Sequence, residues 1–169
     1  HTPMVSWFFN TERYAGVRRV AARTALAKVD CFVVHTEVER HVFSEWLDLP
    51  LERFRFVPLQ YGGCVASDVV PDDEEPFVLA VGSGHRDFAT MFRALEDLQY
   101  PTIVISSARA LEGLTPPACV EIRNSVPRDE IRRMVRRARI NAIPMTTDGV
   151  VGGTVTIVET MRHGRAPVI

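Results

Sequence analysis

Residues 148–169 read DGVVGGTVTIVETMRHGRAPVI and predict a loop, a helix and a further strand. The pair Gly152-Gly153 opens the predicted helix, Gly164 closes it, and a short apolar run follows. Backbone N–H groups at the N-terminus of a helix attract phosphate, and the helix dipole adds to that attraction. Glu159 lies five residues past Thr154, from where its carboxylate could reach hydroxyl groups attached to the phosphate. The stretch therefore predicts a binding site for a phosphorylated ligand.

The composition of the chain is that of a soluble globular protein, with 46% hydrophobic and 24% charged residues among 169. This length fits one domain or one and a half. The net charge of −1 gives no broad electrostatic reason to expect nucleic acid as a partner. Cys31, Cys64 and Cys119 show no C-x-x-C spacing, which is typical of reduced thiols in a cytosolic protein. We therefore expect a cytoplasmic location.

The N-terminal part of the chain predicts helices and strands in alternation. A helix is expected over 11–29, a short buried strand over 31–34 and another strand over 54–57. Thr36 and Glu39 have the spacing of a capping box, so a second helix is expected from there to about Leu47. The apolar side of the first helix is expected to consist of Val17, Val20, Ala21 and Leu26.

The pattern becomes more regular after residues 58–75, which are rich in prolines, glycines and acids and predict a linker. Strands are then expected over 77–81, 102–105, 120–122, 140–144 and 166–169. Helical spacing joins Phe88, Met91, Phe92, Leu95 and Leu98. Pro127 suits the first turn of another helix, whose buried stripe is expected to be Ile131, Met134, Val135 and Ala138. Such alternation predicts right-handed crossovers and a parallel sheet. Ligands of these sheets bind beyond the carboxyl ends of the strands, where the loops 82–87, 106–109 and 146–154 lie.

The order of these elements resembles the glycosyltransferases of group 1, also called family 4, whose two domains have the GT-B fold. The run VETMRHGRAPVI at 158–169 is similar to the family's L-E-A-M-A-x-G-x-P-V-I, and the glycine loop before it and Val81-Gly82 add to the likeness. The resemblance implies an α/β fold with a Rossmann-like parallel sheet and flanking helices, as an incomplete GT-B glycosyltransferase. It implies the end of an N-terminal acceptor-side domain at 1–60, an interdomain linker at 61–75 and a truncated nucleotide-sugar-binding domain at 76–169.

The resemblance also implies transfer of a sugar from a UDP- or GDP-sugar to an unknown acceptor, with retention at the anomeric carbon and without an essential metal or cofactor. The diphosphate is expected at the N–H groups of 152–155 and at Arg86, with Glu159 binding two ribose hydroxyls. The predicted donor-binding residues are Gly82, Ser83, Gly84, Arg86, Gly152, Gly153, Thr154, Val155 and Glu159. No catalytic residue is named. The longer parent could contact a membrane peripherally, and the piece alone is expected to be inactive.

Two positions depart from the family pattern. The family often carries E-x7-E, whose first acid would fall at Val151, with Asp148 as a nearby substitute. The arginine that commonly follows the first glycine is replaced by Ser83, so Arg86 is the nearby cation that could take its role. The identity of the sugar is therefore not indicated by the sequence.

The candidate residues also have plainer interpretations. Gly82-Ser83-Gly84 could be a tight turn, and Asp87 stands where a nicotinamide-binding fingerprint has glycine, so that cofactor is not expected. The arginines between 132 and 139 are interpreted as a solvated face. The histidines are interpreted one by one: His35 as structural, His85 as a possible ligand contact, and His163 as favouring the negative end of its helix. A non-catalytic nucleotide-binding or interaction module, or a GT-B sugar epimerase, is the alternative function.

Overall fold

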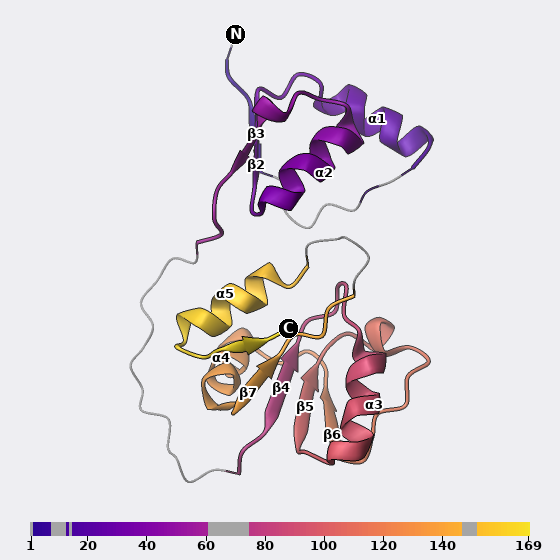
Figure 1. Cartoon of the computed structure of the whole chain (residues 1–169), viewed down its shortest axis with the longest axis vertical. Coiled ribbons are helices and arrows are strands. Elements are labelled where there is room, and N and C mark those ends of the chain that lie inside the picture. The colour runs from indigo at the N-terminus through magenta and orange to yellow at the C-terminus, as the bar shows by residue number, and fades with distance from the viewer. Residues whose placement is uncertain (1, 8–12, 14, 61–74, 147–151) are drawn as a thin grey trace. The chain divides into compact units, whose positions relative to one another are not determined.

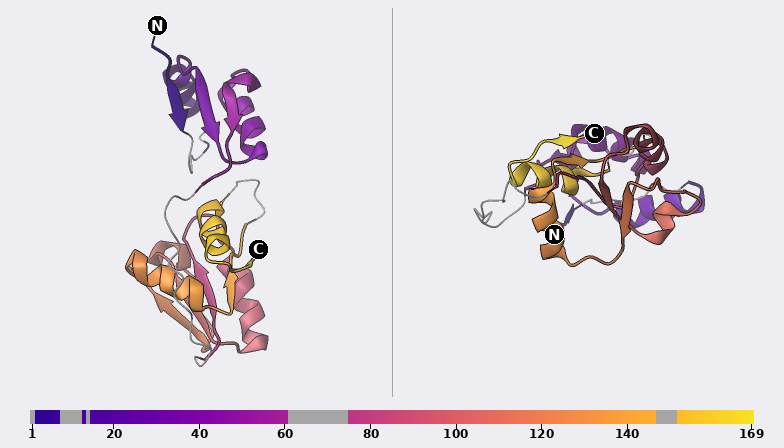
Figure 2. Two further views of the ribbon diagram at one scale, coloured as in Figure 1. Left: turned by 90° about the vertical axis from the view of Figure 1, so that its left-hand side faces the viewer. Right: turned by 90° about the horizontal axis from the view of Figure 1, so that it is seen from below.

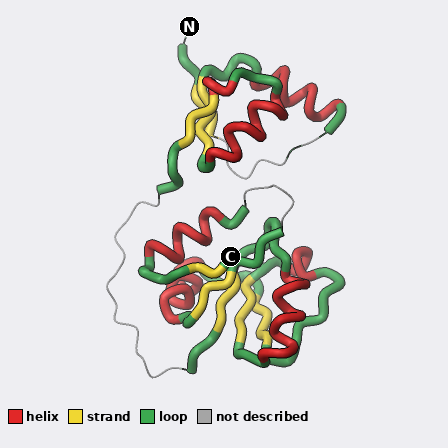
Figure 3. The backbone as a smooth tube through the Cα atoms, in the orientation of Figure 1, coloured by secondary structure: helices red, strands yellow, loops and turns green. Residues whose placement is uncertain are grey.

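The computed structural model describes residues 2–7, 13, 15–60, 75–146 and 152–169 (Figure 1). The chain divides into two compact units, His1–Leu59 and Gln60–Ile169. Each unit has a sheet of parallel strands connected by helices (Figure 3). The predicted α/β class and parallel sheet are thereby confirmed, whereas the roles of the units as acceptor-side and donor-binding domains stay predictions.

The first unit has a three-stranded sheet in the order β1-β2-β3, formed by Val5–Trp7, Cys31–Val34 and Phe54–Phe56. Helix α1 (Val17–Leu26) follows β1, and helix α2 (Glu37–Leu47) and the 3₁₀ turn η1 (Leu51–Arg53) follow β2. Phe32 of β2 stacks on Phe54 of β3 with ring centroids 4.7 Å apart. The rest of this core consists of Val29, Val34, Phe43 and Leu47. The predicted strands 31–34 and 54–57 are present, and β1 is an element that the sequence did not predict.

The predicted capping box at the start of α2 is confirmed. Thr36 Oγ1 accepts a hydrogen bond from the N–H of Glu39 at 3.0 Å. Glu39 Oε2 in turn accepts from the N–H groups of Thr36 at 3.0 Å and of His35 at 2.8 Å. These bonds satisfy N–H groups that have no partner inside the helix, so they fix where α2 begins.

The prediction for the first helix was wrong in its length and in its buried side. The helix begins only at Val17, after Gly16 with a φ of 61°, and it ends at Leu26. Val17 and Val20 are 85% and 63% exposed. The side chains that pack against the core are Ala22 and Leu26, which lie four residues apart on one face. The contact between α1 and the core is therefore narrow and consists of one small and one large apolar side chain.

Both tryptophans of the chain, Trp7 and Trp46, belong to this first unit. Trp7 is 67% exposed, and its Nε1 donates to Nε2 of His35. Nδ1 of His35 lies 2.7 Å from the carbonyl oxygen of Val57, so this buried histidine is bonded at both ring nitrogens. Trp46 packs edge-on against Phe43 at 6.3 Å between ring centroids. His35 therefore holds the end of β2 to two neighbouring segments.

The second unit has a five-stranded parallel sheet in the order β6-β5-β4-β7-β8. The strands are β4 (Val78–Val81), β5 (Thr102–Ile105), β6 (Val120–Arg123), β7 (Ile140–Ala142) and β8 (Pro167–Val168). The chain moves outward from β4 to β6 and then returns to place β7 and β8 on the other side of β4. A sheet that reverses in this way has a crevice beyond the carboxyl ends of the strands where it turns back, here between β4 and β7.

Helices cover both faces of this sheet (Figure 2). Helix α3 (Phe88–Leu98) follows β4, and its Phe88, Phe92 and Leu95 pack on Ala80 and Val104. On the other face, Leu79 and Ile105 contact Met134, Val135 and Ala138, which belong to or follow helix α4 (Arg128–Arg137). Helix α5 (Thr154–Arg162) connects β7 to β8, and the 3₁₀ turn η2 (Ala108–Leu111) follows β5. Adjacent residues of β4 thus serve two separate cores, as the alternation of a strand requires.

Two details of this unit differ from the sequence-based prediction. Leu98 shares the helical spacing of the apolar residues of α3 but is 70% exposed, because α3 ends there. Pro127 lies just before α4 rather than in its first turn. Among the described residues, no helix is long and apolar enough to cross a membrane.

Candidate functional site

The loops after β4 and β7 meet at the point where the strand order reverses. The N–H of Asp87 donates to the carbonyl oxygen of Pro144 at 3.0 Å, and the N–H of Thr146 donates to that of His85 at 3.2 Å. Arg86 and Met145 form an antiparallel bridge between the same two loops. Gly82 follows β4, and Gly152 and Gly153, which precede α5, lie against Met145, His85 and Arg86 of these loops. The described parts of the predicted loops 82–87 and 146–154 are thus in contact through hydrogen bonds.

Gly82 is required by the geometry of the first loop. Its φ is +122°, which side chains rarely adopt, and a Cβ there would lie 2.5 Å from Nη2 of Arg86. Ser83 is used differently, because its Oγ accepts from the N–H of Ser107 at 2.9 Å and lies 3.2 Å from Oγ of Ser106. Ser83 therefore links the loop after β4 to the loop after β5.

Arg86 extends from the first loop toward α5. Nη1 donates to the carbonyl oxygen of Gly84 at 2.9 Å and contacts Sδ of Met145 at 3.2 Å. Nη2 donates to the carbonyl oxygen of Val81 at 3.3 Å and to Oγ1 of Thr156 at 3.4 Å. All of these partners are neutral, and the buried Nε has none in the described part of the chain. Burial lowers the pKa of Arg86, so this cation lies in an environment that disfavours its charge.

Helix α5 begins without a side-chain cap. The residue before its first turn is Gly153, with a φ of 73°, and this glycine has no side chain to accept from the first N–H groups of the helix. A Cβ at Gly153 would lie 3.0 Å from Sδ of Met145 and 3.4 Å from Nη1 of Arg86. A Cβ at Gly152 would lie 2.8 Å from Cε of Met145. Both glycines therefore let the helix begin close to the guanidinium of Arg86.

Glu159 lies one turn further along α5 and is surrounded by two arginines and a histidine. Its carboxylate side chain is 13% exposed. Oε1 lies 3.3 Å from Nε of Arg132 and 3.3 Å from Nε2 of His163, while Oε2 lies 3.8 Å from Nη1 of Arg162. Oε2 accepts no hydrogen bond from the described residues. Glu159 thus links α5 to α4, a contact that the sequence did not predict, and its binding of ribose stays a prediction.

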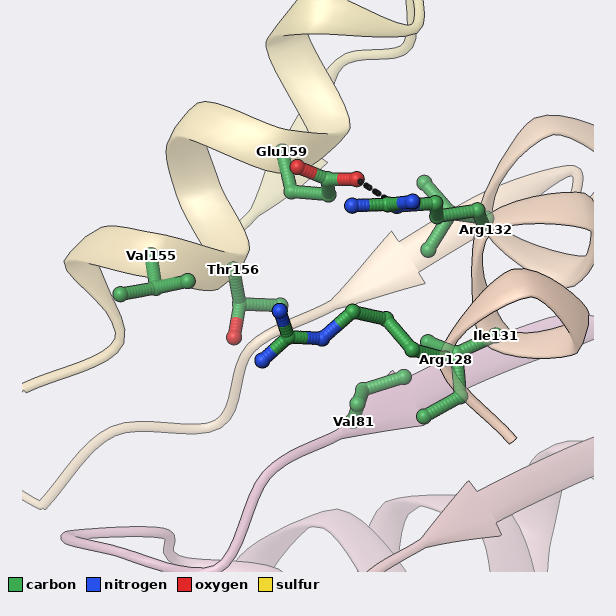
Figure 4. A pocket seen from close by; sticks show the side chains of 8 residues that line it. Val81, Arg128, Ile131, Arg132, Val155, Thr156 and Glu159 are labelled. Atoms are coloured by element: carbon green, nitrogen blue, oxygen red, sulfur yellow. Dashed lines mark hydrogen bonds and ion pairs between the residues drawn. The ribbon is translucent and has the colours of Figure 1, made fainter. Parts of the chain in front are cut away.

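A cavity of about 150 Å³ lies between α4 and α5 beside the end of β4 (Figure 4). Its lining residues are Val81, Arg128, Ile131, Arg132, Val135, Val155, Thr156 and Glu159. The predicted residues Val155 and Glu159 line this cavity. Sequence reasoning missed Arg128 and Arg132, although their spacing of four residues places both on one face of α4. Within the run of arginines at 132–139, which the sequence indicated as mostly a solvated face, Arg132 instead lines the cavity and pairs with Glu159.

Other predicted positions are placed as follows. His85 has a φ of 53° and lies beside Gly152, where a Cβ would be 3.2 Å from the Cβ of His85. His163 ends α5 and pairs with Glu159. Val151 and Asp148, the two positions considered for a first acid, lie outside the described residues. In the described ranges, no group of three His, Cys, Asp or Glu side chains could hold a metal ion.

Comparison with known proteins identifies the fold. No protein family matches the sequence, and no curated protein matches it. The structure is similar to the apo form of the lipopolysaccharide outer core galactosyltransferase WaaB, with a TM-score of 0.55, 12% identity, and coverage of 84% of this chain and 43% of that one. It is also similar to the pneumococcal O-GlcNAc transferase GtfA in complex with UDP and GlcNAc, with a TM-score of 0.55, 14% identity, and coverage of 87% and 31%.

A third similar structure is the GtfA/B complex, with a TM-score of 0.52, 12% identity, and coverage of 87% of this chain and 31% of that one. The chain thus spans between about a third and less than half of the length of the structures it matches. Together these likenesses confirm the predicted fold, which is part of a GT-B glycosyltransferase fold. Membership in group 1 stays a prediction.

Proposed function

We propose that this chain is the donor-binding part of a glycosyltransferase that transfers a sugar from a nucleoside diphosphate sugar to an acceptor. The observation that carries the proposal is the meeting of Arg86 with the uncapped N-terminus of α5. The N–H groups of a helix N-terminus and an arginine are both donors that suit phosphate oxygens. Two positive groups side by side with only neutral partners are stabilised by an anion bound between them.

The proposed donor lies with its diphosphate at residues 152–155 and its nucleoside toward Glu159. Val81 and Val155 provide apolar surface in the adjoining cavity, as a ribose or base requires. Oε2 of Glu159, which accepts no hydrogen bond from the described residues, is the oxygen proposed to accept from a ribose hydroxyl. Because Oε1 already contacts Arg132 and His163, we expect one hydroxyl to be bound more strongly than the other.

The chemistry proposed for the site is stabilisation of the leaving group. Negative charge develops on the diphosphate as the bond to the sugar breaks, and fixed N–H donors beside a partly buried cation stabilise that charge. Arg86 and the first turn of α5 would supply these donors. UDP is a ligand of the similar GtfA structure, and a UDP- or GDP-sugar is the donor proposed here. Retention at the anomeric carbon, the acceptor and a cytoplasmic location are parts of the same proposal.

Calorimetric titration of the wild-type chain with UDP, GDP and pyrophosphate tests the proposal. We expect Arg86→Gln, which keeps hydrogen-bond donors but removes the charge, to weaken the binding of UDP and pyrophosphate by about tenfold or more. Arg93→Gln is the matched control, because Arg93 lies exposed on α3 and donates to Thr90 of the same helix. Absence of binding to the wild-type chain, or equal binding by Arg86→Gln, would contradict the proposal.

A turnover assay with a panel of sugar nucleotides separates the proposed enzyme from its alternatives. Transfer or hydrolysis by the longer parent protein is expected if the site belongs to a glycosyltransferase. Binding of UDP without turnover would favour a non-catalytic nucleotide-binding module. Conversion of the sugar without its release would favour an epimerase.

A further inference from the structure

We propose that Arg128 of α4 is a second cation for the donor's diphosphate, so that the phosphates are bound between α4 and α5. This inference rests on the proposed function, in which the N-terminus of α5 binds the diphosphate. It adds a residue from a different helix, and it predicts that the cavity between the helices receives the second phosphate.

The position of Arg128 in the cavity is the first observation. Arg128 and Thr156 line the cavity from opposite helices. In Figure 4 the guanidinium of Arg128 extends from α4 toward Thr156 in the first turn of α5. Oγ1 of Thr156 also lies 3.4 Å from Nη2 of Arg86. The first turn of α5 is therefore approached by two guanidinium groups, those of Arg86 and Arg128.

The acidic groups near Arg128 are committed to other arginines. Asp129 pairs with Arg132 at 3.1 Å, and Glu159 pairs with the same arginine at 3.3 Å. Glu130 lies 3.8 Å from Arg123. Arg128 itself makes no ion pair or hydrogen bond with any described residue. A cation is also the unfavourable charge for the first residue of a helix, because the helix dipole is positive there.

These charges leave a local excess of positive potential. Arg86 and Arg128 both lie near Thr156 in the first turn of α5, and neither arginine is paired with a described carboxylate. A diphosphate carries negative charge on two neighbouring groups, so one phosphate can contact Arg86 and the N–H groups of α5 while the other contacts Arg128. Arginine suits this role because its planar guanidinium binds two phosphate oxygens at once.

The apolar part of the cavity indicates what is attached to the second phosphate. Val81, Ile131 and Val135 form this surface next to Arg128. A free inorganic phosphate gains nothing from such a surface, whereas a ribose buries its carbon atoms against it. The geometry therefore favours a nucleoside diphosphate over inorganic phosphate as the occupant.

The test compares Arg128→Ala with Arg133→Ala by calorimetric titration of UDP, pyrophosphate and inorganic phosphate. Arg133 is the matched control, because it is an exposed arginine on the same helix that does not line the cavity. We expect Arg128→Ala to weaken UDP and pyrophosphate by about tenfold or more, and Arg133→Ala to change both by less than about twofold. Arg128→Lys is expected to restore part of the affinity, because it returns the charge without the fork of donors.

Each outcome bears on one proposal at a time. If the wild-type chain binds UDP and Arg128→Ala binds it equally well, the role of Arg128 is overturned while the proposed function stands. Equal losses for Arg128→Ala and Arg133→Ala would also overturn it, because they would reflect the general charge of α4. If the wild-type chain binds neither UDP nor pyrophosphate, the proposed function itself fails. Arg128 is exposed, and circular dichroism of each variant checks that the fold is kept.

Discussion

Helices α3 and α5 both begin at the carboxyl edge of the same sheet, after the neighbouring strands β4 and β7, but their N-termini are built differently. In α3, Asp87 Oδ1 accepts from the N–H of Thr90 at 3.0 Å, so the chain itself supplies the anion. In α5, Gly153 stands at the corresponding position and has no side chain with which to cap the helix. Arg86, which directly precedes the cap of α3, is directed to α5 instead. The difference indicates that the N-terminal N–H groups of α3 stabilise the fold, whereas those of α5 are open to a ligand.

The largest expected effect comes from closing the N-terminus of α5. Gly153→Val places a side chain near Met145, Ile143 and Arg86 in a backbone conformation with a φ of 73°. We expect the binding of UDP, measured by calorimetric titration, to weaken by more than about tenfold, because the N–H groups of the first turn lose their access.

Gly164→Val is the matched control for this prediction. Gly164 lies at the other end of α5 with a φ of 68°, and a Cβ there would meet no atom within 4 Å. Both variants share the left-handed strain of about 1–2 kcal/mol, and Gly153→Val adds close contacts with Met145 and Ile143, so thermal unfolding should show the larger loss of stability for Gly153→Val. Equal losses of UDP affinity would remove the N-terminus of α5 as the binding site.

A smaller effect is expected from Glu159→Gln. This variant keeps the shape of the side chain but weakens its acceptors, so UDP should bind roughly 5- to 100-fold more weakly while pyrophosphate binds as before. The comparison of the two ligands matters because Glu159 also pairs with Arg132 and His163. Equal losses for UDP and pyrophosphate would show that Glu159 supports the fold and does not bind ribose.

Removing the cap of a capped helix should lower the stability of the protein and leave its affinity for UDP unchanged. Thr36→Ala removes the acceptor for the N–H of Glu39 in α2 and should lower the free energy of unfolding by about 0.5–2 kcal/mol. We expect the affinity for UDP to be unchanged, since the cap serves only the helix. Thr36→Ser is the control, because serine keeps the accepting hydroxyl. A loss of UDP affinity in Thr36→Ala would contradict the inference that capped helix N-termini serve stability alone.

The smallest expected effect is the pH dependence of the α3 cap. The backbone and side-chain hydrogen bonds to Thr90 hold the pKa of Asp87 below its ordinary value. Asp87 therefore contributes stability above its unfolded-state pKa, and the contribution is lost as the pH falls through the lower folded-state pKa. Asp87→Asn caps equally well without titrating, so the stability advantage of the wild type over this variant should shrink in acid. Chemical denaturation at several pH values measures it, and a constant difference would contradict the assignment.

Elements with a signal inside their own sequence were predicted well. The strand at 102–105 is a continuous run of β-branched residues, and the structure has it at Thr102–Ile105. The helix after Thr36 was predicted from its capping box and begins as expected. β1 was missed because three residues with a serine in the middle carry no such signal, and the strand depends on pairing with β2.

The candidate site was predicted in part, because its contacts join distant segments. The sequence indicated Arg86 and the glycines at 152 and 153 separately, but the contact between Arg86 and Thr156 spans 70 residues. The pairing of Glu159 with Arg132 depends on how α4 and α5 pack on one face of the sheet. Such packing is set by the whole unit and has no local signature.

The confinement of both tryptophans to the first unit has a practical consequence for spectroscopy. Indole fluorescence from Trp7 and Trp46 reports on that unit alone, whereas far-ultraviolet circular dichroism reports on the helices of both units. Unfolding curves recorded with the two signals coincide only if the units unfold together. Without any label, the intact chain thus carries its own optical measure of whether the two units are thermodynamically coupled.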